Sequence, residues 1–142
     1  AEDVGNADPH ALQVAVSAMQ AVNFIGMPEG RIPLAQAVTY VSCAPKSNAA
    51  YLGIDKALAD VRNVQIKGVP PHLRDGHYSG SHDLGNAIGY KYAHDYPNHY
   101  VKQQYLPDVF RDKKFYHMGD LGYEKVMKEH LQRIKGGDMN EE

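Results

Sequence analysis

Three apolar segments with helical spacing, separated by proline and glycine, fill the first part of the chain and restrict the fold that it can adopt. The first is predicted to start at Asp8-Pro9, because an aspartate accepts hydrogen bonds from the free N–H groups of a first turn and proline needs no such bond. It is expected to run to about Phe24, with Gly26 as the residue that ends it.

Proline also bounds the second segment, which is predicted to begin at Pro33 and to end at Pro45. Ser47 is the predicted cap of a third helix, roughly Asn48 to Val61. Because the connecting loops are short, neighbouring helices are expected to run antiparallel.

The apolar residues of these segments recur at a period of about 3.6, which predicts one buried face for each helix. The residues expected in the core are Leu12, Val16, Met19 and Val22, then Leu34, Ala37, Val38 and Val41, then Tyr51, Ile54, Leu58 and Val61. The single cysteine, Cys43, has the same apolar context and is expected to be a buried free thiol. With no second cysteine there is no disulfide framework, and a reducing cytoplasm is the expected compartment.

Glycine, proline, histidine and serine interrupt the pattern from Asn63 to Ser81, which predicts a long ordered loop. Asp83 to Tyr90 is predicted to be a short helix. Asn98 to Tyr105 is predicted to be either a further helix or an extended piece, with proline on both sides.

The last element is predicted from about Leu121 to Lys135, with Asp120 as its cap and Gly136-Gly137 as its end. The residues expected to face inward are Tyr123, Val126, Met127, Leu131 and Ile134. The residues expected on a solvated charged face are Lys125, Lys128, Arg133, Lys135, Glu124 and Glu129. Residues 138–142 are expected to form a frayed tail.

These elements predict an all-α fold, a compact helical bundle in which residues 1–142 form a single domain. The predicted domain includes a long irregular segment rich in histidine and tyrosine. A minor β-hairpin in this segment is an alternative that the sequence does not exclude. The net charge of -2 does not favour a dominant phosphate-binding surface. No apolar run approaches the roughly 18 residues of a membrane span, so no membrane partner is expected.

The His- and Tyr-rich segment, His72 to Pro107, carries five of the eight histidines and six of the ten tyrosines. One hypothesis is a metal-dependent hydrolase, because imidazole and carboxylate groups bind catalytic metals. Its candidate ligands are His77, His82, Asp83, His94 and Asp95. Their spacing argues against it, since glycine and serine surround the first two and neither HExxH nor paired cysteines occur. We therefore expect no catalytic residue, cofactor site or metal site in this chain.

A second hypothesis is single-stranded DNA binding, with tyrosine rings stacking on bases and Arg74, Lys91 and Lys102 contacting phosphates. Tyrosines are equally favoured at protein interfaces, where the ring buries area and the hydroxyl stays hydrogen-bonded. Because the chain has no basic excess, we favour a protein interface. The candidate oligomer or partner contacts are Tyr90, Tyr92, His94, Asp95, Tyr100, Tyr105 and Pro107.

Several long motifs resemble the C-terminal region of the RarA/MgsA family, bacterial replication-associated recombination ATPases of the AAA+ class. The motifs are EDVGNADP at Glu2 to Pro9, GMPEGRIPLAQAVTYVSCAPKSNAAY at Gly26 to Tyr51, VPPHLRD at Val69 to Asp75, YKYAHDYPNHYVKQQYLP at Tyr90 to Pro107 and FYHMGDLGYEKVMKEHLQRIK at Phe115 to Lys135. The family is related to the eukaryotic Werner-helicase-interacting protein and to clamp loaders. One departure is His117-Met118, where relatives often have a proline after the aromatic pair.

The resemblance implies a helical collar that holds ATPase modules together as a homotetramer. It implies a parent protein that binds ATP and Mg²⁺, hydrolyses ATP, acts at stalled replication forks, and engages DNA and single-strand-binding protein in the bacterial cytoplasm, near the nucleoid. The Walker A lysine, the Walker B acid and the arginine finger of the family do not map onto this chain, so it is expected to be non-catalytic. The first collar helix is expected to be truncated, leaving apolar surface exposed.

Overall fold

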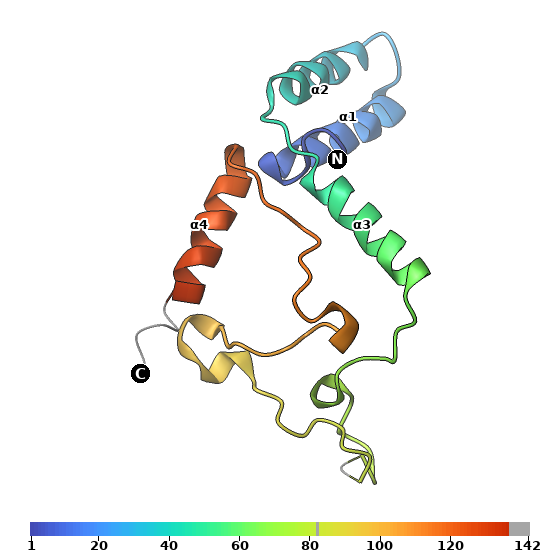
Figure 1. Ribbon diagram of the computed structural model, residues 1–142. Coiled ribbons are helices and arrows are strands. Elements are labelled where there is room, and N and C mark those ends of the chain that lie inside the picture. The colour runs from blue at the N-terminus through green and yellow to red at the C-terminus, as the bar shows by residue number, and fades with distance from the viewer. Residues whose placement is uncertain (82, 137–142) are drawn as a thin grey trace. The chain divides into compact units, whose positions relative to one another are not determined.

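The computed structural model describes residues 1–81 and 83–136, and its regular structure is helical (Figure 1). The helices are α1 (His10–Ile25), α2 (Arg31–Cys43), α3 (Ala49–Asn63) and α4 (Gly122–Gly136). Short 3-10 turns occur at Gly5–Ala7, Pro71–Leu73, Ala93–Asp95, Pro97–His99 and Asp108–Phe110. The described residues contain no strand, so the all-α prediction is confirmed and no β-hairpin forms within them.

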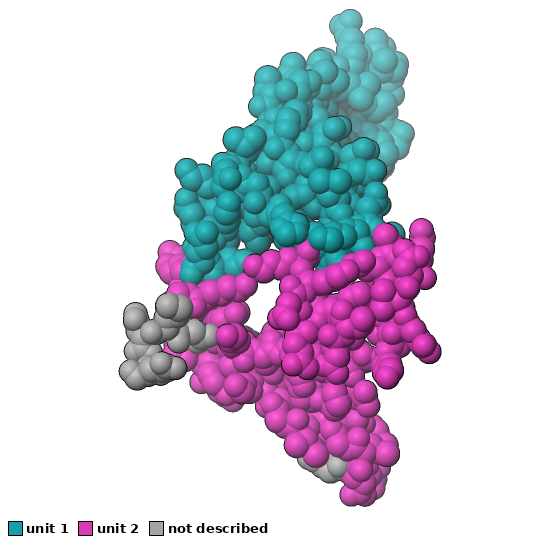
Figure 2. All heavy atoms as spheres, in the orientation of Figure 1, with its two compact units in different colours: residues 1–58, 115–132 teal, residues 59–114, 133–142 magenta. Residues whose placement is uncertain are grey.

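The chain divides into two units, which Figure 2 shows in separate colours. The first unit comprises residues 1–58 and 115–132, and the second comprises residues 59–114 and 133–142. The first unit contains α1, α2 and most of α3 and α4, whereas the second consists mainly of loops and 3-10 turns.

Helices α1 and α2 pack side by side as a hairpin (Figure 1). The turn between them depends on two glycines. Gly26 adopts a φ of 70° and its N–H bonds to the Val22 carbonyl, as predicted for the residue that ends α1. Gly30 lies so close to Gly26 that an added Cβ would come within 2.7 Å of the Gly26 carbonyl oxygen. The antiparallel arrangement predicted from the short loop is therefore confirmed for α1 and α2.

The predicted start of α1 is also confirmed. One Asp8 carboxylate oxygen accepts a 3.0 Å hydrogen bond from the His10 N–H, and the other accepts one of 2.9 Å from the Tyr40 hydroxyl of α2. Helix α2 begins at Arg31, two residues earlier than predicted, which places Pro33 within the first turn, where its missing N–H costs nothing.

The core of the first unit is made of small side chains rather than of the aliphatic residues predicted for it. Val4, Ala11 and Ala44 form a buried cluster with Val41 packed against it. Most of the predicted core is exposed instead: Leu12, Val16, Met19, Leu34, Val38, Tyr51, Ile54, Leu58, Val61, Tyr123 and Val126. For these residues the prediction was wrong, because a helical period identifies an apolar face but not what covers it. For Ala37, which is buried, it is confirmed. Cys43 is likewise exposed, not buried.

Side-chain and backbone hydrogen bonds hold the second unit around a few buried residues, among them Val101, Phe110, Ser81 and Asn86. The Ser81 hydroxyl donates to the Gly76 carbonyl at 2.8 Å. The Asn86 amide donates to the Tyr78 hydroxyl at 2.7 Å. This matches the prediction of an ordered loop rather than a disordered one between α3 and Ser81.

The predicted short helix at Asp83 to Tyr90 does not form. Gly85, Ala87 and Gly89 have φ values of 72°, 58° and 79°, and such left-handed residues cannot continue an α-helix. Beyond the turn at Pro97–His99 the chain reaches Tyr105 without a helix, which agrees with the extended alternative. His82, Gly137 and the predicted tail of residues 138–142 lie outside the described residues.

Candidate association surface

An apolar groove runs along one side of the α1–α2 hairpin and has a volume of about 540 Å³. Its lining residues are Ala15, Ala18, Met19, Val22 and Asn23 from α1, and Leu34, Ala37, Val38, Val41 and Ser42 from α2. Met19 and Val38 are 55% and 64% exposed, more than half of each residue. Ala18 and Ala37 are buried in this groove, whereas the larger apolar side chains Met19 and Val38 remain open to solvent.

No charged side chain interrupts this hairpin over most of its length. Residues 11–28 and residues 32–45 contain no Asp, Glu, Lys or Arg, and only Glu29, Gly30 and Arg31 separate the two stretches. An exposed helix of a soluble protein normally carries charges on its solvent face, whereas interface cores are depleted of them. The absence of charged residues was visible in the sequence, but the helical periodicity alone led to the wrong prediction that these apolar faces are buried.

A second groove of the hairpin, of about 450 Å³, has a mixed lining. Its polar lining residues are His10, Gln13, Ser17 and Gln36, and its apolar ones are Val14, Ala18, Ala21 and Pro33. It therefore lacks the almost wholly apolar character of the first groove.

The contact residues predicted in the His- and Tyr-rich segment all lie in the second unit. The Tyr92 ring lies 5.1 Å from the His94 ring, and the His94 ring lies 4.9 Å from that of His99. Asn98 and His99 hold this turn with φ values of 54° and 51°, which non-glycine residues seldom adopt. Asp95 closes the adjacent turn through its N–H, which donates to the Tyr92 carbonyl.

Gln103 organises the next group. Its amide oxygen accepts from the Lys91 N–H at 3.2 Å, and its amide nitrogen donates to the Lys91 carbonyl at 2.8 Å and to the Tyr105 hydroxyl at 3.0 Å. Tyr90 and Tyr105 are exposed, and Tyr100 is half-buried. Pro107 lines a separate pocket of about 440 Å³ together with Pro70 and Pro71. The exposed tyrosines are accessible to a partner, and their role as contacts stays a prediction.

The candidate metal ligands are not gathered into one site. His77 is almost fully exposed, and its Nδ1 lies 2.8 Å from the carboxylate of Asp75, two residues away. His94 is engaged with Tyr92 and His99 instead. Among residues 1–81 and 83–136, no three His, Cys, Asp or Glu side chains are placed to hold one metal ion, and His82 lies outside this range.

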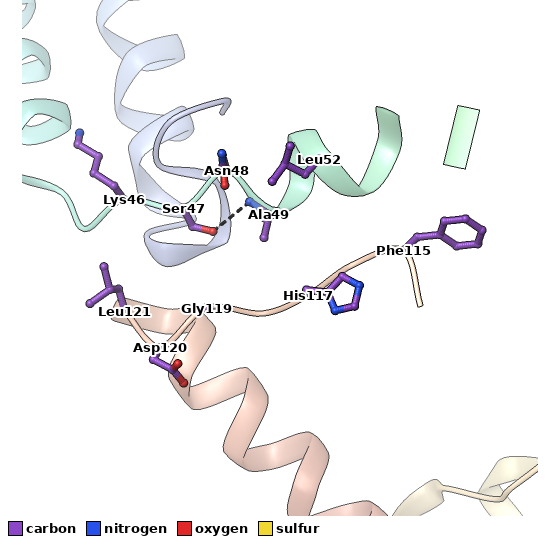
Figure 3. Close-up of a pocket in the computed structure, with 10 residues that line it drawn as sticks. All are labelled: Lys46, Ser47, Asn48, Ala49, Leu52, Phe115, His117, Gly119, Asp120 and Leu121. Carbon is purple, nitrogen blue, oxygen red and sulfur yellow. Dashed lines mark hydrogen bonds between the residues drawn. The ribbon is translucent and has the colours of Figure 1, made fainter. Parts of the chain in front are cut away.

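A further pocket, of about 290 Å³, lies at the start of α3 in the first unit (Figure 3). Its lining residues are Lys46, Ser47, Asn48, Ala49, Leu52, Phe115, His117, Gly119, Asp120 and Leu121. The main polar groups of this pocket form hydrogen bonds within the protein. Lys46 Nζ donates to the Val41 carbonyl at the end of α2, and the Asp120 carboxylate binds Lys128 at 2.7 Å. The Ser47 hydroxyl accepts from the Ala49 N–H, as predicted for a cap of α3.

The deepest charged group of the first unit is Glu124 in α4, which is fully buried. This corrects the prediction that it belongs to a solvated face. Ser47 and the Gly119 N–H each donate to its carboxylate at 2.8 Å, and the Tyr116 hydroxyl donates a short bond to it. Burial acts to raise the pKa of Glu124, but the bonds from Tyr116, Ser47 and Gly119 outweigh it and leave the pKa below its ordinary value.

The same cluster changes Tyr116. Burial and the hydrogen bond to Glu124 raise the pKa of its hydroxyl, against a smaller effect of Asn6, whose amide donates to that hydroxyl at 2.9 Å. Glu124 and Tyr116 together join four segments, namely the chain before α1, the linker before α3, residues 115–119 and α4. The arrangement is a structural anchor, because every oxygen of the carboxylate is occupied.

None of the described helices combines the length and apolarity required to cross a lipid bilayer.

Comparison with known proteins identifies the family of this chain. Residues 1–135 match the family described as MgsA AAA+ ATPase C terminal. The chain is 47% identical over 94% of its length to the replication-associated recombination protein A of Bacillus subtilis, and 39% identical over 98% of its length to that of Escherichia coli K12. A protein of Haemophilus influenzae with the same name is 41% identical over 96% of the chain.

The chain spans about a third of each of these relatives, between 31% and 32% of their length. The match covers both units, including the helical hairpin, the His- and Tyr-rich segment and the Glu124 cluster. This chain therefore belongs to the C-terminal family of the MgsA AAA+ ATPases.

Proposed function

We propose that this chain is the non-catalytic oligomerisation module of an AAA+ ATPase that acts in DNA replication, recombination and repair. The observation that carries the proposal is the amount of apolar side chain left open on its helices. The exposed residues include Leu12, Val16 and Met19 of α1, Ile32, Leu34 and Val38 of α2, Tyr51, Leu52, Ile54, Leu58 and Val61 of α3, and Tyr123 and Val126 of α4. Among them, Met19, Leu34 and Val38 line one apolar groove, and apolar side chains gathered in this way are a mark of protein–protein contact.

The family match indicates the kind of larger protein in which this surface would act. The relatives are named for replication-associated recombination and are about three times as long as this chain. In the proposed parent, ATP and Mg²⁺ belong to an ATPase domain outside these residues, and the present chain holds such domains together as a homotetramer. We place the parent in the bacterial cytoplasm with the nucleoid, engaged with DNA and with single-strand-binding protein.

The same structure gives less support to a hydrolytic role than to an oligomerisation role. His77 is solvent-exposed against Asp75, and the buried carboxylate of Glu124 is saturated by hydrogen bonds. A general base or nucleophile needs a free lone pair within reach of a substrate. The geometry of the described residues thus favours a scaffold.

The solution mass of the chain tests the proposal. Light scattering across a range of protein concentrations, with metal content measured on the same samples, is expected to give a homotetramer whose mass does not depend on added metal. A monomer at every concentration would contradict it. A monomer carrying stoichiometric metal would favour the hydrolase instead.

A further inference from the structure

We propose that a pocket of the second unit, walled by proline and flanked by two cationic side chains, binds a short acidic peptide segment of a partner protein. This proline pocket has a volume of about 440 Å³. The lining residues that carry the argument are Lys67, Val69, Pro70, Pro71, Arg74 and Pro107. The inference goes beyond the oligomerisation function, because it concerns a site in the second unit and a different kind of partner.

Hydrogen bonds brace the walls of the proline pocket. His72 Nε2 lies 2.7 Å from the Gln104 carbonyl oxygen, so the turn that carries Pro71 is held to the segment that leads to Pro107. The Gln104 amide also donates to the Leu106 carbonyl at 2.8 Å. Proline adds stiffness, because its ring fixes φ and it has no N–H to leave unpaired. A preformed pocket of this volume is typical of ligand sites and loses little conformational entropy on binding.

The two cationic side chains have hydrogen-bond donors to spare. Arg74 Nε donates to the Val69 carbonyl at 2.9 Å, which fixes the position of the guanidinium. Among residues 1–81 and 83–136, neither the terminal N–H groups of Arg74 nor Nζ of Lys67 have a hydrogen bond or an ion pair. Both residues are exposed. A guanidinium that is held through Nε directs its remaining N–H groups at a carboxylate in a defined geometry.

The acidic residue at the pocket does not cancel these charges. One carboxylate oxygen of Asp108 accepts from the Gln104 amide at 2.9 Å and from the Arg111 guanidinium at 2.7 Å. Arg111 therefore compensates Asp108, whereas Lys67 and Arg74 have no acidic partner within the part of the chain that the structure describes. The pocket thus combines positive charge with apolar walls, and its complement is an anionic ligand with apolar groups.

The lining of the pocket favours a peptide over a nucleic acid. Single strands are held by aromatic rings on which the bases stack, and the described lining residues include no Phe, Tyr, Trp or His. The walls are instead formed by proline together with Val69 and Val109, which suit aliphatic side chains. A peptide that carries aspartate or glutamate beside aliphatic residues therefore matches both parts of the site.

The test measures binding of a fluorescent peptide of alternating aspartate and leucine to the full chain of 142 residues, by fluorescence anisotropy. A matched peptide has asparagine in place of aspartate. We expect the acidic peptide to bind about 10-fold or more tightly than the asparagine peptide, since charge-assisted hydrogen bonds to Lys67 and Arg74 are lost in the latter. Equal binding of the two peptides, or no binding of the acidic one up to about 1 mM, would overturn the inference.

Two charge-matched variants locate the site. Lys67→Gln and Lys102→Gln each remove one positive charge from an exposed position of the second unit, and only Lys67 lines the pocket. Lys67→Gln should weaken binding of the acidic peptide by about 5-fold or more, and Lys102→Gln by less than about 2-fold. Lys67→Gln is more informative than a change of Arg74, because it breaks no hydrogen bond among the described residues. Equal losses in the two variants would show general charge attraction and exclude the pocket.

A competition experiment separates the two kinds of anionic partner. Oligothymidylate should not displace the acidic peptide, and displacement would assign the pocket to nucleic acid instead of peptide. Light scattering on the same samples shows whether the oligomeric state changes. Lys67→Gln should keep the wild-type mass, so loss of peptide binding and loss of oligomerisation are separate results. A monomeric wild-type chain that still binds the peptide at Lys67 would contradict the proposed function and support this inference.

Discussion

Ser47 and Glu124 lie 77 positions apart in the chain, and the Ser47 hydroxyl donates a 2.8 Å hydrogen bond to the Glu124 carboxylate. The same hydroxyl accepts from the Ala49 N–H at 3.2 Å, so one side chain both caps α3 and binds α4. The linker between α2 and α3 is thereby fixed to the start of α4 within the first unit. The contact also explains how a fully buried carboxylate is tolerated there.

Ser47→Ala is expected to lower the free energy of unfolding by about 2 kcal/mol, because a hydrogen bond to a charged group and a helix cap are lost together. Urea unfolding at fixed protein concentration measures the change. Thr39→Ala is the matched control, since the Thr39 hydroxyl is exposed and bonds only to carbonyls of its own helix. It should stay within about 0.5 kcal/mol of the wild type. Equal effects of the two variants would show that the Glu124 contact contributes nothing.

Acid should remove the stabilisation that Glu124 provides. Its pKa is below the ordinary value in the folded chain, so the unfolded chain takes up the proton first as the pH falls. The contribution is therefore complete above a pH of about 4.3, the ordinary pKa of glutamate. It is lost as the pH falls from there through the lower pKa of the folded state.

Comparison of the wild type with Glu124→Gln isolates this effect, because Asp75, Asp108 and Asp120, whose pKa values are also lowered, are common to both proteins. The difference in free energy of unfolding should be constant near neutral pH and should shrink below pH 4. A difference that stays constant down to pH 3 would contradict the assignment.

The sequence predicted the four α-helices well, but the short helix that it predicted at Asp83 to Tyr90 does not form, and its prediction of which residues are buried was poor. The Asp8 start and the Gly26 end of α1 depend on hydrogen bonds and backbone angles within a few residues, so they could be predicted locally. The exposure of Met19 and Val38 could not, because an apolar face has the same pattern whether its own chain or another chain covers it.

The prediction for Glu124 was wrong in the opposite direction, because it was expected to be exposed and is buried. It stands among lysines on α4, and its burial depends on Ser47, Tyr116 and Gly119, which no spacing rule connects to it. For the candidate site, the missing charges of α1 and α2 were visible in the sequence and give the better signal. The His- and Tyr-rich segment stood out by its composition, and its role as a contact surface stays a prediction.

Gly122 should tolerate no side chain. Its φ is 55°, and an added Cβ would lie 2.1 Å from the Ala7 carbonyl oxygen. Gly85 has a similar φ of 72° but open space around it, which makes Gly85→Ala a control for backbone strain alone. We expect Gly85→Ala to cost about 1–2 kcal/mol and Gly122→Ala clearly more, measured as the shift in urea midpoint. Similar midpoints for the two variants would mean that the contact between Gly122 and Ala7 is not tight.

Gln103→Ala tests how the second unit is held. The Gln103 side chain makes three hydrogen bonds, two to the backbone of Lys91 and one to the Tyr105 hydroxyl, all exposed to solvent. Its loss should therefore change the free energy of unfolding by less than about 1 kcal/mol while releasing the Lys91 amide. Hydrogen exchange followed by mass spectrometry should show faster exchange in peptides around residues 91 and 105, with α1 and α2 unchanged. Lys102→Ala, an exposed neighbour, provides the control and should leave exchange around residue 91 as it is. Unaltered exchange in Gln103→Ala would show that the two segments are held by contacts other than this amide.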